Sequence, residues 1–318
     1  GVPLSLARCP ASVKFAIFEI GMNHPGEITP LVKMVRPHVA IITTVEPVHL
    51  EFFSGIEAIA DAKAEIFSGL EPGGAAVLNR DNSQFARLTK SAKTAKVGRI
   101  VSFGSDKKAD ARLLDVSLHP ACSAVHADIL GQDITYKVAM PGRHMAMNSL
   151  AVLAAASLAG ADLALSALAL AQLKPASGRG VREVLTLKDG IATLIDESYN
   201  ANPASMNAAI TVLGQADVGP RGRRIAVLGD MLELGPAGPD LHRGLNDAIK
   251  ANVIDAVFCC GPLMRNLWEA LPSTKKGGYA DNSADLERQV VAAIGVGDAV
   301  MVKGSLGSRM KLIVTALQ

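Results

Sequence analysis

The sequence has few aromatic residues and no excess of charge of either sign. Only 4% of its 318 residues are Phe, Trp or Tyr, while 49% are hydrophobic and 19% are charged. Lys and Arg number 32, and Asp and Glu number 30. This near balance excludes the strongly basic surface that a nucleic-acid partner requires. The composition is typical of a globular protein with aliphatic cores, and the length allows two domains.

Cysteine is scarce, and its four positions show no metal-ligand spacing: Cys9, Cys122, Cys259 and Cys260. Cys259 and Cys260 follow the apolar run 256–258, which predicts a buried strand with reduced thiols. Because reduced thiols are typical of the cytoplasm, we expect a cytoplasmic protein.

Long hydrophobic runs and a secretory signal are also missing. Residues 150–173 are almost all Ala and Leu, but Gly160 and Asp162 interrupt them, and alanine is only weakly apolar. We therefore expect two core helices joined by a turn, and no membrane span. The N-terminal residues lack the charged-then-apolar pattern of a signal peptide.

Short apolar runs alternate with helical patterns through the first part of the chain. Residues 14–20, 39–43 and 75–78 have the composition of buried strands. Residues 27–35 and 56–69 have the periodicity of helices. This alternation predicts an α/β fold with a mostly parallel sheet and helices on its faces.

Three runs with a period of two follow between residues 112 and 140, and they predict a small antiparallel sheet added to the parallel one. Residues 174–178 (KPASG) are the best candidate for a linker and a hinge. Beyond them the alternation restarts, with strands expected near 182–187, 191–196, 224–228, 254–258 and 298–302. We therefore predict two domains, residues 1–176 and 177–318.

Three residues with suitable chemistry lie close to expected strand ends. Glu19 ends the first strand, His49 follows the second, and Lys63 lies on the next helix. Ligands of open α/β sheets bind at that edge, and carboxylate and imidazole groups can hold a divalent ion. A plainer interpretation stays open for each residue: a turn cap for Glu19, a loop hydrogen bond for His49, and an ion pair on an exposed helix face for Lys63.

The sequence around these residues resembles the Mur ligase family. The run 18–28 (FEIGMNHPGEI) is similar to the E-M-G-x-N-H-P-G-E-I segment of the family, and residues 48–51 and 59–67 are similar to its next two blocks. The resemblance implies that Glu19 and His49 bind Mg²⁺. It also implies that Lys63 is carbamylated and helps to hold a second Mg²⁺, since a hard cation prefers oxygen ligands.

Two further blocks imply contacts with ATP. Residues 141–148 resemble the segment whose asparagines contact adenine, and here Met145 replaces the first asparagine and Asn148 matches the second. Gly178-Arg179 matches the position of an arginine that reaches the nucleotide phosphates, which a forked guanidinium suits. Without the resemblance, Arg179 reads as an ordinary linker residue.

The block 196–206 (DESYNANPASM) carries the most specific resemblance. It implies that Asp196 lies near the ribose and metal, and that the following turn lies beside the incoming amine substrate. The substrate-binding residues it implies there are Tyr199, Asn200 and Asn202. Helix capping by Asn202 and Pro203 is a compatible alternative.

Two blocks near the C-terminus extend the resemblance. One is 229–235 (GDMLELG), with His242 on the next helix. The other contains Lys303 and Ser305 in a glycine-containing turn between a strand and a helix, which suits an anionic substrate group. A plain structural turn remains an alternative for Lys303 and Ser305.

The resemblance is strongest to members of the family that join D-alanyl-D-alanine to UDP-N-acetylmuramoyl-tripeptide. It implies a truncated central ATPase-type domain followed by a Rossmann-like C-terminal domain. It also implies an ATP- and Mg²⁺-dependent reaction through an acyl phosphate, in the synthesis of peptidoglycan precursors. Both substrates are small molecules, and we expect a monomer.

The G-x-x-G-K-[ST] phosphate-binding loop of the family is absent from the sequence. We therefore expect a fragment that begins inside the central domain and is inactive alone. Another Mur-type amide ligase and a non-catalytic nucleotide- or partner-binding paralogue remain alternatives. A dinucleotide-dependent oxidoreductase ranks last, because no G-x-G-x-x-G run opens a helix after a strand.

Overall fold

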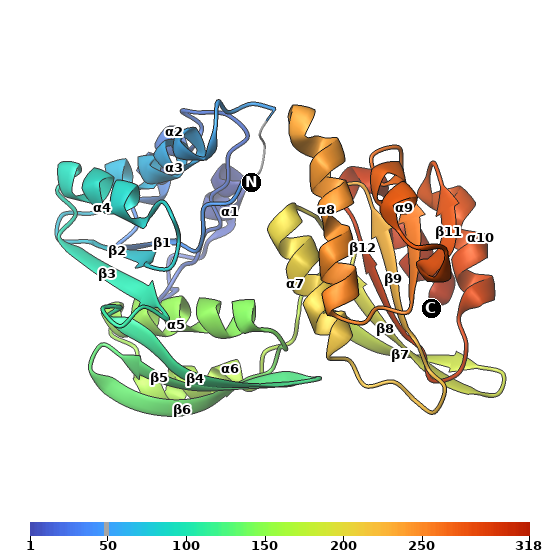
Figure 1. Ribbon diagram of the computed structural model, residues 1–318. Helices are drawn as coiled ribbons and strands as arrows, with labels where there is room; N and C mark the ends of the chain where they lie inside the picture. The colour runs from blue at the N-terminus through green and yellow to red at the C-terminus, as the bar shows by residue number, and fades with distance from the viewer. Residues whose placement is uncertain (48–50) are drawn as a thin grey trace. The chain divides into compact units, whose positions relative to one another are not determined.

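The computed structural model describes residues 1–47 and 51–318, and the chain divides into two compact units. The first unit comprises Gly1–Ser117, Ser123–Val138 and Arg143–Gln172. The second comprises Leu173–Gln318 with the short stretches Leu118–Cys122 and Ala139–Gly142. Each unit is built on its own six-stranded sheet (Figure 1).

The sheet of the first unit is continuous, and its strands follow chain order from one edge to the other. The strands are β1 (Val39–Ile42), β2 (Ala75–Asn79), β3 (Arg99–Gly104), β4 (Ala111–His119), β5 (Cys122–Ile129) and β6 (Gln132–Val138). Neighbours from β1 to β4 are parallel, whereas β5 and β6 are antiparallel. The three strands expected between 112 and 140 are thus confirmed, and they extend the parallel sheet itself.

Helices pack on both faces of this sheet (Figure 1). They are α1 (Val2–Arg8), α2 (Ile28–Val35), α3 (Ile56–Ala64), the 3-10 turn η1 (Glu65–Gly69), α4 (Phe85–Thr94), α5 (Arg143–Leu158) and α6 (Leu163–Leu170). Val32, Ile59 and Leu88 project from α2, α3 and α4 into one apolar core with Leu78 of β2. This packing fixes α2 and α3, and α3 carries Lys63 of the predicted metal site.

The two helices expected in the Ala/Leu run are confirmed as α5 and α6. Gly160 lies between them with φ +84°, a conformation that glycine adopts without strain. Asp162 then caps α6, because its side chain accepts a hydrogen bond from the Leu165 amide at 2.8 Å. Within residues 1–47 and 51–318, no helix is long and apolar enough to cross a membrane.

The strand expected at residues 14–20 was a wrong prediction. The segment has no regular secondary structure, and Phe15 and Ile17 are 60% and 96% exposed. An apolar run forms a buried strand only where a neighbouring strand supplies hydrogen bonds, and none of β1–β6 pairs with this segment. Glu19 therefore lies in an irregular, exposed stretch rather than at a strand end.

The sheet of the second unit has the order β11-β10-β9-β12-β8-β7. The strands are β7 (Val181–Leu187), β8 (Gly190–Glu197), β9 (Arg224–Gly229), β10 (Ala256–Cys260), β11 (Lys276–Ala280) and β12 (Ala299–Lys303). Only β7 is antiparallel to its neighbour. Cys259 and Cys260 lie buried in β10 as free cysteines.

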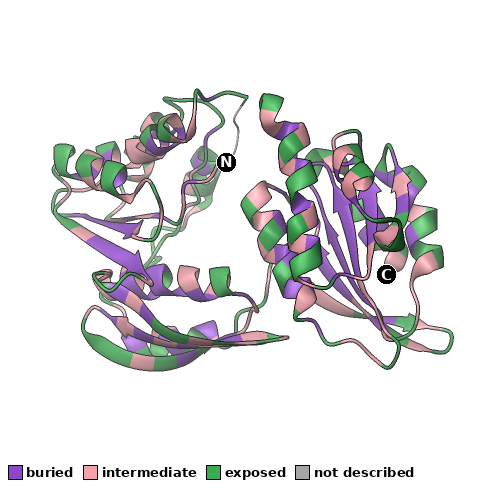
Figure 2. Ribbon diagram, in the orientation of Figure 1, coloured by how far each residue is buried: buried purple, intermediate pink, exposed green. Residues whose placement is uncertain are grey.

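Helices cover both faces of the second sheet as well. They are α7 (Pro203–Gly214), α8 (Gly238–Ala251), α9 (Arg265–Ala270), α10 (Ser283–Ala293) and α11 (Lys311–Leu317), with 3-10 turns η2 (Gly235–Ala237), η3 (Ser273–Lys275) and η4 (Leu306–Ser308). Residues of α7, α8 and α9 share one core, and residues of α10 and α11 share the other. Figure 2 shows the buried strands between the partly exposed helices.

The chain changes direction across the second sheet between β9 and β12. The helix after β9 (α8) packs on one face, and the helix after β12 (α11) packs on the opposite face. The carboxyl ends of two such strands form the crevice in which open α/β sheets bind ligands. The turns after β9 and β12 are therefore where a ligand of this unit is expected.

Candidate functional site

Two glutamates fix the loop between Glu19 and α2. The side chain of Glu27 accepts hydrogen bonds from the amides of Asn23 and His24 at 2.7 and 3.2 Å, and these bonds lower the pKa of Glu27. Glu65, at the end of α3, accepts bonds from the amide of Gly26 at 2.6 Å and from the amide and hydroxyl of Thr29. The loop and the start of α2 are thereby tied to the helix that carries Lys63.

Lys63 lies in the last turn of α3 and is half-buried. Burial lowers the pKa of its amine, and in the described part of the chain no carboxylate offsets this effect. Lys63 therefore differs from an exposed lysine that pairs with a neighbouring acid.

The predicted convergence of Glu19, His49 and Lys63 stays a prediction. Glu19 is exposed, Lys63 is half-buried, and His49 lies outside the described residues. Among residues 1–47 and 51–318, no three His, Cys, Asp or Glu side chains gather in a way that holds a metal ion.

The carboxyl ends of β1 and β2 are joined by two asparagines. The side-chain amide of Asn79 donates to the carbonyl of Thr43 at 2.9 Å. That of Asn82 donates to the hydroxyl of Thr44 at 3.1 Å and to the carbonyl of Val45 at 2.9 Å. These three hydrogen bonds fix the carboxyl end of β1 to the turn that follows β2.

Asn148 is half-buried near the start of α5. The preceding Arg143 donates to the hydroxyl of Ser105 at 2.9 Å, and Asp81 accepts a bond from the Ser105 amide at 2.6 Å. The start of α5 is therefore fixed to the turns after β2 and β3. A role of Asn148 toward adenine is not tested by these contacts.

In the second unit, Arg179 lies on the ring of Tyr199. Its guanidinium carbon is 4.3 Å from the ring centroid, and both residues are exposed. Gly178 makes this approach possible: it has φ +74°, its carbonyl accepts the Tyr199 amide at 3.1 Å, and a Cβ here would come within 3.0 Å of Tyr199. Arg179 is thus oriented by the tyrosine while its donors remain accessible.

Asp196, at the end of β8, is buried and fully engaged. It accepts bonds from the amide and hydroxyl of Ser198 and from the ammonium of Lys311 at 3.0 Å. Burial by itself would raise the pKa of Asp196. The hydrogen bonds lower it by more, so the pKa of Asp196 lies below its usual value. The side chain of Lys311 is 51% exposed, whereas that of Asp196 is 2% exposed. The sequence analysis did not single out Lys311.

Lys303, at the end of β12, is also committed to internal contacts. Its ammonium donates to the carbonyl of Asn200 at 2.8 Å and lies 3.5 Å from a carboxylate oxygen of Glu197. The side chains are 4% and 23% exposed. Burial lowers the pKa of Lys303 and raises that of Glu197, because it disfavours both charges. Lys303 therefore holds the backbone of the turn at Asn200.

Asn202 and Ser305 complete the fixation of this turn. Asn202 caps α7 in a reciprocal pair with Ser205, so the predicted capping is confirmed. Ser305 is buried, and its hydroxyl accepts the Leu232 amide at 2.9 Å and lies 3.3 Å from the carbonyl of Ala201, to which it donates. The structure thus brings the turns after β8, β9 and β12 together. Of the predicted site residues in this region, Arg179, Tyr199 and Asn200 are exposed, and so is Lys311.

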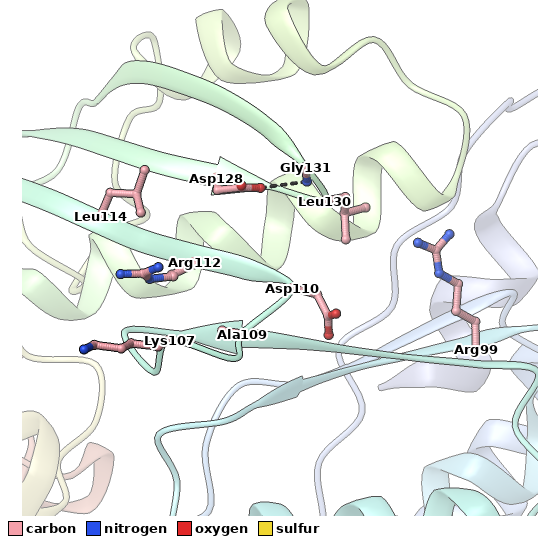
Figure 3. Close-up of a pocket in the computed structure, with 9 residues that line it drawn as sticks. All are labelled: Arg99, Lys107, Ala109, Asp110, Arg112, Leu114, Asp128, Leu130 and Gly131. Atoms are coloured by element: carbon pink, nitrogen blue, oxygen red, sulfur yellow. Dashed lines mark hydrogen bonds between the residues drawn. The ribbon is translucent and has the colours of Figure 1, made fainter.

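A hollow of about 400 Å³ in the first unit contains none of the predicted site residues (Figure 3). Its lining residues are Arg99, Lys107, Ala109, Asp110, Arg112, Leu114, Asp128, Leu130 and Gly131. Asp110 and Asp128 counter much of the positive charge, and Asp128 is bonded to the Gly131 amide at 2.7 Å. Because the lining carries side chains of both charges, it favours neither an anionic nor a cationic ligand.

Comparison with known proteins connects both units to one family. The Mur ligase middle domain matches residues 1–156, and the domain described as Mur ligase, glutamate ligase domain matches residues 182–306. UDP-N-acetylmuramoyl-tripeptide–D-alanyl-D-alanine ligases of Rickettsia prowazekii and Escherichia coli are 30% and 33% identical to the chain. Both alignments cover 100% of the chain, and they cover 69% and 68% of those relatives.

Solved structures agree with the sequence relatives. A crystal structure of MurF from Acinetobacter baumannii is 27% identical, with a TM-score of 0.86 over 99% of this chain and 67% of that one. MurF from Thermotoga maritima in complex with ADP is 26% identical, with a TM-score of 0.75 over 92% of this chain and 64% of that one. The sheets, the strand-end turns and the similarity over the full chain together lead to one conclusion: the chain belongs to the Mur ligase family.

Proposed function

We propose that the protein is an ATP-dependent ligase that joins D-alanyl-D-alanine to UDP-N-acetylmuramoyl-tripeptide in the synthesis of peptidoglycan precursors. The turn Tyr199–Asn202 between β8 and α7 is the main support. Its sequence resembles that of the D-alanyl-D-alanine-adding members, and Lys303 and Ser305 hold its backbone. The two relatives described above carry the same activity in their names.

The proposed reaction has two steps. A carboxylate oxygen of the tripeptide attacks the γ-phosphorus of ATP, which gives an acyl phosphate and ADP. The amine of the dipeptide then attacks the acyl carbon, and the tetrahedral intermediate releases inorganic phosphate and a proton. Arg179 would orient the phosphates through its exposed donors, and Asn148 would contact adenine. The turn at Tyr199 and Asn200 would place the amine for attack.

We also propose that Lys63 carries a carbamate. Its half-buried amine has a lowered pKa, and carbamylation replaces an ammonium with an acidic group. With Glu19 and His49 it would then hold Mg²⁺, which neutralises charge on the phosphoryl group when bound. The carboxylate and carbamate oxygens fit the preference of this ion.

The remaining parts of the proposal concern the whole chain. We infer domains 1–176 and 177–318, hinged at 174–178, since Pro175 and Gly178 bracket a link without apolar periodicity. Because the sequence has no G-x-x-G-K-[ST] run, we propose that this chain alone does not release ADP. A monomer in the cytoplasm is consistent with its reduced thiols and small-molecule substrates.

The first test is direct binding of D-alanyl-D-alanine to this chain, followed by amide NMR. We expect shifts at residues 199–202, reduced for L-alanyl-L-alanine. Asn200→Ala should weaken binding, while Thr211→Ala on the exposed side of α7 serves as the matched control, because its hydroxyl bonds only within the helix. Stronger binding of a single amino acid than of the dipeptide would favour another amide ligase.

The second test is catalysis. The chain would be assayed alone and as a fusion, joined at Gly1 to the part of the Escherichia coli relative that precedes the aligned region. Product from the fusion with UDP-N-acetylmuramoyl-tripeptide, D-alanyl-D-alanine, Mg²⁺ and ATP is the expected outcome. Nucleotide binding without product would instead support the non-catalytic paralogue.

A further inference from the structure

His242 is a buried histidine that the proposed reaction does not use. It lies in the second turn of α8 and is 0% exposed. Its Nε2 accepts the amide of Met231 at 2.9 Å, and its Nδ1 donates to the carbonyl of Gly238 at 2.6 Å. Because an amide can only donate, Nε2 must be unprotonated, and the ring is the neutral Nδ1–H tautomer.

The bond to Met231 holds the turn that follows β9. In this turn, Glu233 has φ +63°, a left-handed conformation that a residue with a side chain seldom adopts unless its surroundings hold it there. Met231 is 0% exposed and belongs to the core under α7 and α8. Its amide would be a buried donor without an acceptor if His242 lost its lone pair.

A path of adjacent contacts leads from this turn to the proposed dipeptide site. The next amide, that of Leu232, donates to the hydroxyl of Ser305 at 2.9 Å. The same hydroxyl donates to the carbonyl of Ala201, inside the turn Tyr199–Asn202. The amide of Ser305 also donates to the carbonyl of Asp230 at 3.0 Å. Moving Met231 therefore displaces the Leu232 amide and, through it, the Ser305 hydroxyl that donates to the Ala201 carbonyl.

We propose that His242 is a positioning residue for the amine-substrate site, acting through Met231, Leu232 and Ser305 on the turn Tyr199–Asn202. This role rests on the proposed function, because it assigns that turn to D-alanyl-D-alanine. His242 itself contacts no substrate. Its contribution is a neutral imidazole whose acceptor faces a backbone amide.

The same geometry makes the site sensitive to acid. Protonation would turn Nε2 into a second donor facing the Met231 amide, and the bond would be lost. The pKa of His242 is lowered mainly by burial, and the carboxylate of Asp230 opposes this effect. Asp230 acts on the ring through its charge, while its oxygens accept the amides of Leu263 and Met264.

The test uses the full chain with two substitutions at one position. His242→Phe keeps a ring and removes the acceptor, whereas His242→Gln keeps an acceptor and a donor. Asn246→Ala is the control on the same helix, because its side chain bonds to Ala270 and not to the turn. Amide shifts and hydrogen exchange would be measured at Met231, Leu232 and Ala201, and then the dissociation constant for D-alanyl-D-alanine.

In His242→Phe, we expect exchange at Met231 and Leu232 to quicken at least tenfold, with shifted signals at Ala201 and dipeptide binding about tenfold weaker. His242→Gln should bring the exchange rates, the Ala201 signals and the dipeptide affinity most of the way back to those of the unaltered chain. Asn246→Ala should change none of these three properties. Unchanged Ala201 signals in a folded His242→Phe chain would overturn the positioning role, whether or not the dipeptide binds. Failure of the unaltered chain to bind would count against the proposed function alone.

A measurement on the unaltered chain keeps the inference falsifiable if His242→Phe does not fold. Nitrogen NMR of the ring should show an unprotonated Nε2 at neutral pH. On acidification, loss of that state should coincide with the signal changes at Ala201. An Nε2–H tautomer, or ring protonation that leaves Ala201 unaffected, would refute the proposal.

Discussion

Replacing Lys303 with methionine tests the view that this lysine supports the turn from inside the protein. Methionine fills a similar volume but removes the bond to the Asn200 carbonyl and the charge near Glu197. The carboxylate of Glu197 would then be left in a mostly buried position without its cation. If Lys303 instead served only a bound ligand, its removal would stabilise or barely affect the free chain.

The expected size of the effect follows from the burial of both partners. Removing one member of a buried ion pair costs about 3–5 kcal/mol. Because the Glu197 side chain keeps 23% of its surface exposed, we expect the lower end, about 3 kcal/mol. With a urea dependence of about 2 kcal/mol per molar, the midpoint of unfolding should fall by about 1.5 M.

Tryptophan fluorescence gives a readout specific to the second unit. The sequence has one tryptophan, Trp268, which lies in α9 and packs against the core of that unit. Urea unfolding would be followed for the unaltered chain, Lys303→Met, Glu197→Gln and the double variant. We expect the double variant to be less destabilised than Lys303→Met, since it leaves no unpaired charge.

The pH dependence provides a separate check. The pKa of Glu197 is raised by burial, and loss of Lys303 removes an interaction that lowers it. As the pH falls through that raised pKa, protonation of Glu197 should therefore reduce the loss of unfolding free energy that Lys303→Met causes. If Lys303→Met and the double variant lowered the free energy of unfolding by the same amount at every pH, the proposed support of the turn by this pair would be refuted.

Three further outcomes are expected. Asn202→Ala should destabilise the second unit by about 1 kcal/mol in urea, because it removes the cap of α7, whereas Thr211→Ala should not. The folded pKa of His242 lies below its ordinary value of about 6.5, so the unfolded state binds the proton first. The free energy of unfolding should therefore fall as the pH drops below about 6.5, and His242→Gln should flatten this slope. In the fusion protein, Lys63→Ala should reduce ligase activity about 100-fold or more, and short carboxylic acids should restore part of it. An equally active alanine variant would exclude the carbamate.

Periodicity in the sequence predicted those elements whose side chains meet a core within their own unit. The alternation around Val125, Ala127 and Ile129 gave β5, and all three residues are 0% exposed. The break at Gly160 and Asp162 separated α5 from α6 because each residue has a local role, as a positive-φ turn and as a cap. Such features depend on neighbours in the chain and can be read without the fold.

Elements that depend on distant partners were missed or misplaced. β11 contains Gly277 and Gly278, which carry no apolar pattern, and yet Cβ atoms there would come within 2.5 and 2.4 Å of Phe258 and Gln289. The glycines allow the close approach of β10 and α10, which only the folded sheet shows. β3 was missed as well. The opposite error occurred at 14–20, where an apolar run pairs with no described strand.

The residue types of the second-unit site were predictable, but their roles were not. Lys303 and Ser305 were selected because their block resembles the family, and because a glycine-containing turn between a strand and a helix suits an anionic ligand. In the structure both are nearly enclosed and bond to the backbone at Asn200 and Ala201. Lys311 is an exposed lysine beside these turns, and no local pattern distinguishes it from other lysines at the start of a helix.

This division of roles follows from the geometry of parallel strands. The strand ends bring residues from three distant parts of the chain to one edge, so a buried polar group there will satisfy its bonds with a neighbouring turn. The enclosed side chains then fix backbone positions, and the outer residues remain free for a ligand. His242 belongs to the same enclosed set, because its ring accepts the Met231 amide as the Ser305 hydroxyl accepts the Leu232 amide. A substitution in the inner layer should therefore alter the free protein first, while a change at Tyr199 or Arg179 should alter binding alone.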